Sequence, residues 1–112
     1  HQYGGTPLYE ESQRRWKSYT KEQKQKIFDE GNQVYRDLIA AIPFGAGSDE
    51  VQQCITRWHQ HLRNFYEPPV EVLLGLGDLY NDNPEFRANF DRMDPRLAPF
   101  MREAILVYLD RM

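Results

Sequence analysis

The stretch VQQCITRWHQHLRNFYEPPVEVLLGLGDLY, residues 51–80, determines the fold that this sequence predicts. In its first half, apolar residues recur every three or four positions, which is the spacing of one face of an α-helix. They are Val51, Ile55, Trp58, Leu62 and Phe65. The second half, residues 70–80, is apolar on most sides, as expected of a helix that other helices surround. The Pro68-Pro69 pair separates the halves, so the stretch predicts two successive central helices in an all-α domain.

Two helices are predicted ahead of this stretch. Thr6 and Pro7 mark the start of a short first helix, as N-cap and first helical residue. Thr20 and Gln23 have the spacing of a capping box, which starts the second helix. The face of the second helix expected to pack on the core is Ile27, Phe28, Gly31, Val34, Tyr35, Leu38, Ile39 and Ile42.

Two further helices are predicted after the central stretch, a short one after Pro84 and a last one after Asp94-Pro95. The apolar stripe of the last helix is Leu97, Phe100, Met101, Ala104, Ile105, Tyr108 and Leu109. Gly75 and Gly77 are unfavourable within a helix and predict a close approach by a neighbouring helix. Because no strand pattern is found, the prediction is a single all-α domain over residues 1–112.

Composition restricts the classes of partner. The net charge of −3 argues against direct contact between this segment and nucleic acid, and no apolar run is long enough to span a membrane. The single cysteine, Cys54, excludes an internal disulfide and fits a cytoplasmic location. Seven Tyr, six Phe and two Trp exceed what a small core needs and favour a ligand-binding surface. Since the chain lacks an initiator Met, we expect it to be a piece of a longer protein.

The residues that carry chemistry do not form a catalytic or metal site. His59 and His61 are two apart, so on a helix they point about 200° apart and cannot bind one ion together. Cys54 lies at a core-flanking position and is expected to be an inert buried thiol. No carboxylate pair and no phosphate-binding loop are found. The residues therefore predict a non-enzymatic helical binding module with no cofactor and no metal.

Several motifs, taken in order, resemble those of one known family. YGGTPLYEES, residues 3–12, resembles its W-G-x-T-x-x-Y-x-x-S element, with Tyr3 in place of the tryptophan. GDLY, residues 77–80, followed by Phe86, resembles its G-E-M-Y motif with a phenylalanine six positions later. Residues 95–105, which begin PRLA, resemble its P-G-L-A closing helix. Other similar segments are residues 18–22, Trp58 and residues 64–66. The family is the TipAS antibiotic-recognition domain, found at the C-terminus of some MerR-type transcription regulators.

The resemblance implies a globin-like fold without haem, whose cleft binds bulky hydrophobic antibiotics or drugs. It also implies that the first helix, within residues 1–19, orders over the ligand as a lid. Members that bind thiopeptides covalently have a cysteine where this chain has Gly75, which argues against covalent capture here. DNA binding and dimerisation would come from a winged-helix domain and a coiled coil outside this chain. The fragment is then expected to be monomeric and the full-length protein a homodimer.

The candidate ligand-binding residues are mostly aromatic, because flat rings and a polarisable Met suit large, flat antibiotics. They are Tyr9, Trp16, Trp58, His61, Leu62, Phe65, Tyr66, Tyr80, Phe100 and Met101. Two alternatives stay open. The chain could be a stand-alone protein that sequesters antibiotics, or a protein-interaction module whose aromatic groove binds an amphipathic partner helix.

Overall fold

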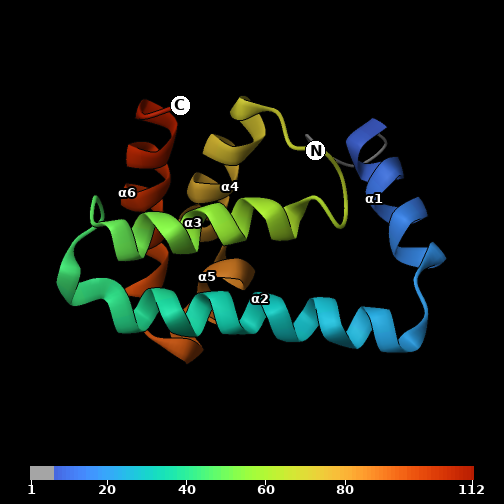
Figure 1. Ribbon diagram of the computed structural model, residues 1–112, viewed down its shortest axis with the longest axis horizontal. Helices are drawn as coiled ribbons and strands as arrows, with labels where there is room; N and C mark the ends of the chain where they lie inside the picture. Colours follow the sequence, from blue (N-terminus) through green and yellow to red (C-terminus); the bar gives the residue numbers. More distant parts are fainter. Residues whose placement is uncertain (1–6) are drawn as a thin grey trace.

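The computed structural model describes the backbone of residues 7–112 and the side chains of residues 9–112 (Figure 1). The described residues form helices only, which confirms the all-α prediction. The α-helices are α1 (Pro7–Ser18), α2 (Lys21–Ala41), α3 (Asp49–Leu62), α4 (Val70–Asp82), α5 (Pro84–Met93) and α6 (Leu97–Asp110). A short 3₁₀ helix, η1 (Ile42–Phe44), follows α2. The predicted cap Thr6 lies outside the described residues.

Side-chain caps start three of these helices. At α2 the predicted capping box is present, because Thr20 Oγ1 accepts from the Gln23 amide at 3.1 Å and Gln23 Oε1 accepts from the Thr20 amide at 2.8 Å. The Ser48 hydroxyl accepts from the Val51 amide to start α3, and the Asn83 side chain caps α5. Each cap satisfies amide groups that a helix leaves unpaired at its start.

The helices cross in two layers. In Figure 1, α2 and α3 lie side by side in front, and α4 and α6 cross behind α3. The most extensive packing is between α4 and α6, and α5 packs on both. Helix α1 stands at the end where α2 begins and packs on the rest less extensively than the other α-helices (Figure 1).

The apolar stripe of α3 forms the centre of the core, as predicted. Val51, Ile55 and Trp58 are fully buried, while Phe65 lies just beyond α3 and is half-buried. Other large side chains that are fully buried are Leu38, Leu73, Leu97, Met101 and Ile105. Cys54 is buried and free, and burial raises the pKa of its thiol.

Gly77 confirms the predicted close packing. A Cβ atom placed on it would lie 3.4 Å from Ile105 Cδ1 and 3.6 Å from the Arg102 Cα of α6. Helices α4 and α6 thus pack closely at this point, although a Cβ atom would make only ordinary van der Waals contacts there.

Two predictions about burial are wrong. Helix α4 is not surrounded, since Leu74 is 40% exposed and only one face, which includes Leu73 and Tyr80, is buried. The physical reason is that α4 packs on α5 and α6 from one side. Phe28 is 63% exposed although it continues the apolar stripe of α2. The N-terminal half of α2 reaches past α4, α5 and α6, so no helix of that group covers it (Figure 1).

These burial differences predict that two truncations change the stability of the domain by very different amounts. Ile55→Ala is expected to lower the free energy of unfolding by about 2–5 kcal/mol, because it leaves a cavity in the core. Phe28→Ala is expected to change it by less than about 0.5 kcal/mol, because the ring is exposed. Urea unfolding followed by circular dichroism measures both. A loss of comparable size for Phe28→Ala would show that its ring packs on the core.

Candidate ligand-binding site

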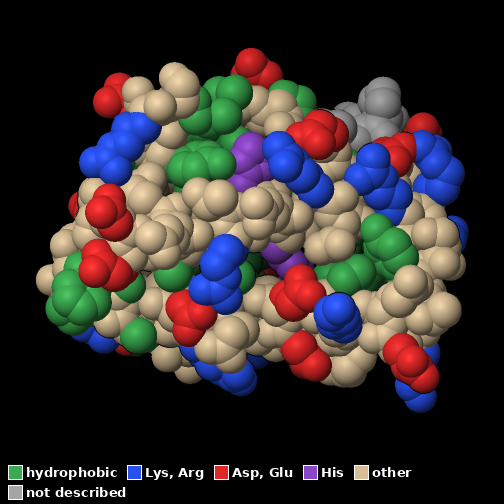
Figure 2. Space-filling model, in the orientation of Figure 1, with side chains coloured by type: hydrophobic (Ala, Val, Ile, Leu, Met, Phe, Trp, Pro, Cys, Tyr) green, Lys and Arg blue, Asp and Glu red, His purple; other side chains and the backbone are tan. Residues whose placement is uncertain are grey.

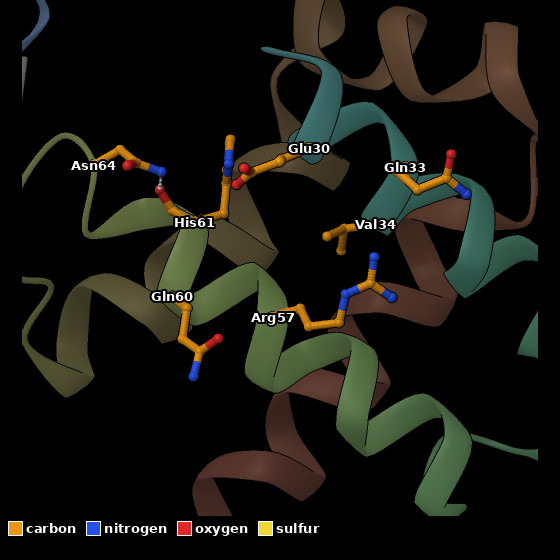
Figure 3. A pocket seen from close by; sticks show the side chains of 7 residues that line it. All are labelled: Glu30, Gln33, Val34, Arg57, Gln60, His61 and Asn64. Carbon is orange, nitrogen blue, oxygen red and sulfur yellow. Dashed lines mark hydrogen bonds between the residues drawn. The ribbon is translucent and has the colours of Figure 1, made fainter. Parts of the chain in front are cut away.

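A cavity of about 360 Å³ lies between α2 and α3, within the size range of small-ligand sites (Figure 3). Helix α2 contributes Glu30, Gln33 and Val34. The other lining residues, from α3 and the turn after it, are Arg57, Gln60, His61 and Asn64. Counted from Arg57, they occupy positions i, i+3, i+4 and i+7, so they lie along one face of α3 and of the turn that follows it. The cavity is therefore lined mainly by polar side chains from two neighbouring helices.

His61 is the most enclosed polar side chain of this cavity. Its Nδ1 atom is buried and has no hydrogen-bond partner among the described residues. The far edge of its ring lies against α2 at Gly31, where an added Cβ atom would be 2.9 Å from Nε2. Any larger residue at position 31 would therefore displace the ring. In Figure 3 the Glu30 side chain points toward this ring.

Next to the cavity is an aromatic cluster, defined here as Trp16, Tyr19, His61 and Phe65. The Phe65 ring lies 5.7 Å from the ring of His61 and 5.6 Å from that of Trp16. The Tyr19 ring packs edge-on against Trp16 at 6.4 Å. The cluster thus connects α1 to the wall of the cavity through three successive rings. Figure 2 shows a histidine in the furrow between α2 and α3, with hydrophobic side chains on its α1 side.

Hydrogen bonds to the end of α3 hold α1 in place. Arg15 Nη1 donates to the Arg63 carbonyl at 2.7 Å, and the Tyr19 hydroxyl donates to the Asn64 carbonyl. Carbonyl groups at a helix C-terminus lack partners within the helix and carry partial negative charge. Donors at the C-terminal end of α1 and just beyond it therefore stabilise the end of α3.

Some charges on the cavity wall are neutralised by an ion pair, and one is not. Arg57 Nη1 lies 2.7 Å from Asp37, which also accepts from Gln33 at 2.9 Å. These hydrogen bonds, that of Arg57 first, lower the pKa of Asp37, so the pair is ionised and neutral overall at pH 7. Glu30 has no ion-pair partner among the described residues. Burial lowers the pKa of His61, so the imidazole is neutral at pH 7 and Glu30 supplies the net charge of the cavity.

Comparison with known proteins decides the family. The family model of the TipAS antibiotic-recognition domain matches residues 1–108. The chain belongs to this family. A solved structure of TipAS from Streptomyces lividans, in complex with the thiopeptide nosiheptide, superposes with a TM-score of 0.87. That chain is 33% identical, and the match covers 98% of this chain and 79% of the other. The globin-like fold predicted for a TipAS domain is thereby confirmed.

Other relatives are longer transcription activators. The HTH-type transcriptional activator TipA of Streptomyces coelicolor is 35% identical over 107 residues, or 93% of this chain. The HTH-type transcriptional activator mta of Bacillus subtilis is 27% identical over 95% of this chain. This TipAS chain spans 42% of the length of each of these two relatives.

The predicted site residues of this TipAS domain divide into two groups. Trp16, His61 and Phe65 meet in the aromatic cluster, with Tyr9 exposed on α1 and Tyr66 half-buried after α3. The second group lies away from this cluster. Trp58, Leu62, Tyr80 and Met101 are buried in the core, and Phe100 is half-buried against it. In this arrangement of helices the four core side chains are covered by protein.

Burial also explains the pKa of a tyrosine in that core. Desolvation raises the pKa of Tyr35 to about 12. The Tyr35 side chain is therefore neutral at pH 7 and belongs to a packed support rather than to a reactive site.

Sequence reasoning missed most of the cavity wall. The missed residues are Glu30, Gln33, Val34, Arg57, Gln60 and Asn64. The sequence did contain a signal, because three polar or charged residues of α3 and Asn64 just after it recur at helical spacing on one face. Without knowing which helix lies opposite, that face reads as an ordinary solvated surface.

No group of three or more His, Cys, Asp or Glu side chains among the described residues could hold a metal ion. None of the described helices is long and apolar enough to cross a membrane.

Gly31→Ala is expected to push the His61 ring out of its position, because the new Cβ atom would overlap it. The free energy of unfolding should change by less than about 1 kcal/mol, since alanine adds up to about 1 kcal/mol of helix propensity that offsets the lost packing. Imidazole NMR signals of His61 measure the displacement. Gly77→Ala is the matched control, because a Cβ atom there makes only ordinary contacts. Unchanged His61 signals in Gly31→Ala would contradict this packing.

Acid is expected to destabilise the TipAS domain through its two described histidines. Desolvation lowers the pKa of both His59 and His61 in the folded state, and the Nδ1 atom of His59 lies 2.8 Å from the Tyr108 hydroxyl. The unfolded chain, with histidine pKa values near 6.5, therefore binds more protons at mildly acid pH. The stability that depends on His59 and His61 being neutral in the folded state is fully present above about pH 6.5 and is lost as the pH falls below that value.

Urea unfolding of the wild type and of the His59→Asn/His61→Asn double variant, at several pH values from 8 to 5, measures this effect. The wild type should lose stability below about pH 6.5. The double variant is expected to be less stable throughout but to depend less on pH. Equal pH slopes in the two proteins would show that other groups are responsible.

Proposed function

We propose that this TipAS domain senses antibiotics or other bulky hydrophobic drugs, which it binds reversibly and without catalysis. The observation that carries the proposal is the match over 98% of the chain to TipAS, whose solved structure contains nosiheptide. At 33% identity and a TM-score of 0.87, the same helices occupy the same places, which supports a related binding role.

The chemistry of the candidate site supports the same role. The aromatic cluster offers four flat rings, and each of them is half-buried. Flat, partly exposed rings can stack on the planar heterocycles of an antibiotic with little loss of conformational entropy. The adjacent polar cavity can hydrogen-bond to the amide groups that peptide antibiotics carry. We assign Tyr9 and Tyr66 to the same binding surface as further walls.

We propose that residues 1–19, which include α1, act as a lid on this surface. Arg15, Trp16 and Tyr19 provide the contacts that connect this segment to the end of α3. A helix of twelve residues has little stability of its own in water, so its position depends on these few contacts. A ligand placed between Trp16 and Phe65 would replace the contact between these two rings with a larger contact area.

We further propose that residues 1–112 are the drug-binding domain of a MerR-type regulator that acts in the cytoplasm. The matched relatives are HTH-type activators more than twice as long as this chain. DNA contact and homodimerisation then belong to other segments, which agrees with the net charge of −3 of this one. Reversible capture is supported by the burial of Cys54, the only cysteine of the chain.

Tryptophan fluorescence can test this proposal, because the two tryptophans report different places. Trp16 contacts Phe65 at the aromatic cluster, whereas Trp58 is 1% exposed in the core. Titration of the Trp58→Phe variant with nosiheptide should give a saturable change. The Trp16→Phe variant should give little change, because its remaining tryptophan lies in the core, and it should bind more weakly, because the smaller phenyl ring offers less area for stacking.

Amide hydrogen exchange during the same titration tests the lid. Slower exchange across α1 in the complex is expected. A flat fluorescence response of the wild type to nosiheptide and to other bulky antibiotics would overturn the sensing function. Binding with unchanged exchange in α1 would overturn the lid alone.

A further inference from the structure

Three hollows surround the N-terminal half of α2, and one residue lines all of them. Besides the cavity of about 360 Å³, there is a hollow of about 210 Å³ whose lining includes Tyr19 and Asn64. A third, open hollow of about 570 Å³ follows the outer face of α2. Glu30 is the described residue common to the three. In Figure 3 its side chain points toward His61, so its carboxylate borders the cavity between α2 and α3.

The charge of Glu30 is not neutralised within the described part of the chain. Arg57, the cation on the opposite wall, is paired with Asp37 at 2.7 Å. Lys26, one turn earlier on α2, lines the hollows of about 210 Å³ and 570 Å³ but does not come within ion-pair distance of Glu30. The effect of Glu30 nevertheless reaches the cavity, because its negative charge opposes the lowering of the His61 pKa.

The other groups on the wall add hydrogen-bond acceptors rather than positive charge. His61 is neutral at pH 7, so one of its ring nitrogens can accept a hydrogen bond. The Asn64 side-chain amide donates to the His61 carbonyl at 2.8 Å, which leaves its own oxygen free to accept. A carboxylate, an imidazole nitrogen and an amide oxygen together suit a ligand that carries N–H donors and a positive charge.

The aromatic cluster already attracts a cation in this structure. Lys24 Nζ lies 5.3 Å from the centre of the Trp16 ring, within the range of a cation–π interaction. The ring series from Trp16 through Phe65 to His61 leads from this position to the cavity. A flat aromatic body could stack along the rings while a positive group reaches Glu30.

We propose that the cavity between α2 and α3 selects cationic ligands, flat aromatic molecules that carry an ammonium or amidinium group, and that Glu30 binds the positive charge. The inference rests on the proposed function in that it treats this cavity as part of the ligand-binding site. The inference adds a preference for positively charged ligands, which membership of the family does not by itself imply. Neutral ligands would bind through the rings alone, and anionic ones would be repelled by Glu30.

Three pyrene probes of one shape and different charge test the inference. They are 1-pyrenemethylammonium, neutral 1-pyrenemethanol and anionic 1-pyrenecarboxylate, titrated at pH 7.5 with pyrene fluorescence as the readout. The wild-type domain should bind the cation about five- to tenfold more tightly than the neutral probe, and the anion most weakly. The difference should shrink in 0.5 M salt, because screening weakens a partly exposed charge pair.

Glu30→Gln and Asp29→Asn are the matched variants, since each removes one negative charge from α2. Asp29 lines only the outer hollow and accepts a hydrogen bond from Gln25. Glu30→Gln should lower the affinity for the cation to that for the neutral probe, whereas Asp29→Asn should keep the preference. Equal binding of the three probes, absence of binding, or an equal effect of both variants would overturn the inference.

A nosiheptide titration of the wild type separates this inference from the proposed function. Nosiheptide binding without a Glu30-dependent charge preference would overturn the inference and leave antibiotic sensing in place. A Glu30-dependent preference without binding of nosiheptide or other antibiotics would overturn antibiotic sensing and support a cation site in the cavity.

Discussion

The burial of the apolar face of α3 is the interaction on which the rest of the structure depends. Val51, Ile55 and Trp58 are almost completely removed from water, and each side chain buried in this way contributes about 1.5–3 kcal/mol. Helix α3 packs on both α2 and α6, so this face joins the two layers of the fold. With that face in the core, the orientation of α3 about its own axis is determined. The flank of α3 that carries Arg57 and His61 then borders α2, and the cavity follows from that orientation.

Contact between α2 and α3 depends on a small residue at one point. Because Gly31 has no side chain, the His61 ring can lie against the backbone of α2 and still contact Phe65. Phe65 in turn contacts Trp16, so a single close approach in the body of the domain positions the ring that receives α1. Helix α1 also donates to carbonyls at the end of α3, which have no partner within that helix. Helix α1 and the cavity are thus linked through the same few residues.

Electrostatics gives the two sides of the site different properties. Where Arg57 and Asp37 face each other, the charges cancel and the wall is polar but neutral. Glu30 lacks such a partner among the described residues, and its negative charge extends over the hollows on both sides of it. Aromatic rings beside one carboxylate without an ion-pair partner are the combination on which the proposed preference for flat cationic ligands rests.

The sequence alone determined the helices, because capping residues and apolar spacing are local properties of the chain. The capping box at Thr20, the buried stripe of α3 and the close packing at Gly77 were all predictable in this way. Three of the ten predicted site residues, Trp16, His61 and Phe65, meet in the aromatic cluster. The order of the family motifs predicted the globin-like fold, which depends on the whole chain rather than on any one residue.

Only the tertiary structure decided which faces are covered and which residues meet. Phe28 continues the stripe of Ile27 and Val34, yet it is exposed because α2 extends beyond the helices that cover its other half. Tyr80 was predicted at the site, yet α5 covers it through Phe86 and Phe90. Glu30 and His61 are thirty-one positions apart and face each other only because α2 and α3 pack side by side. Which helices become neighbours is a long-range property, set by the total burial of apolar surface and not by any local pattern.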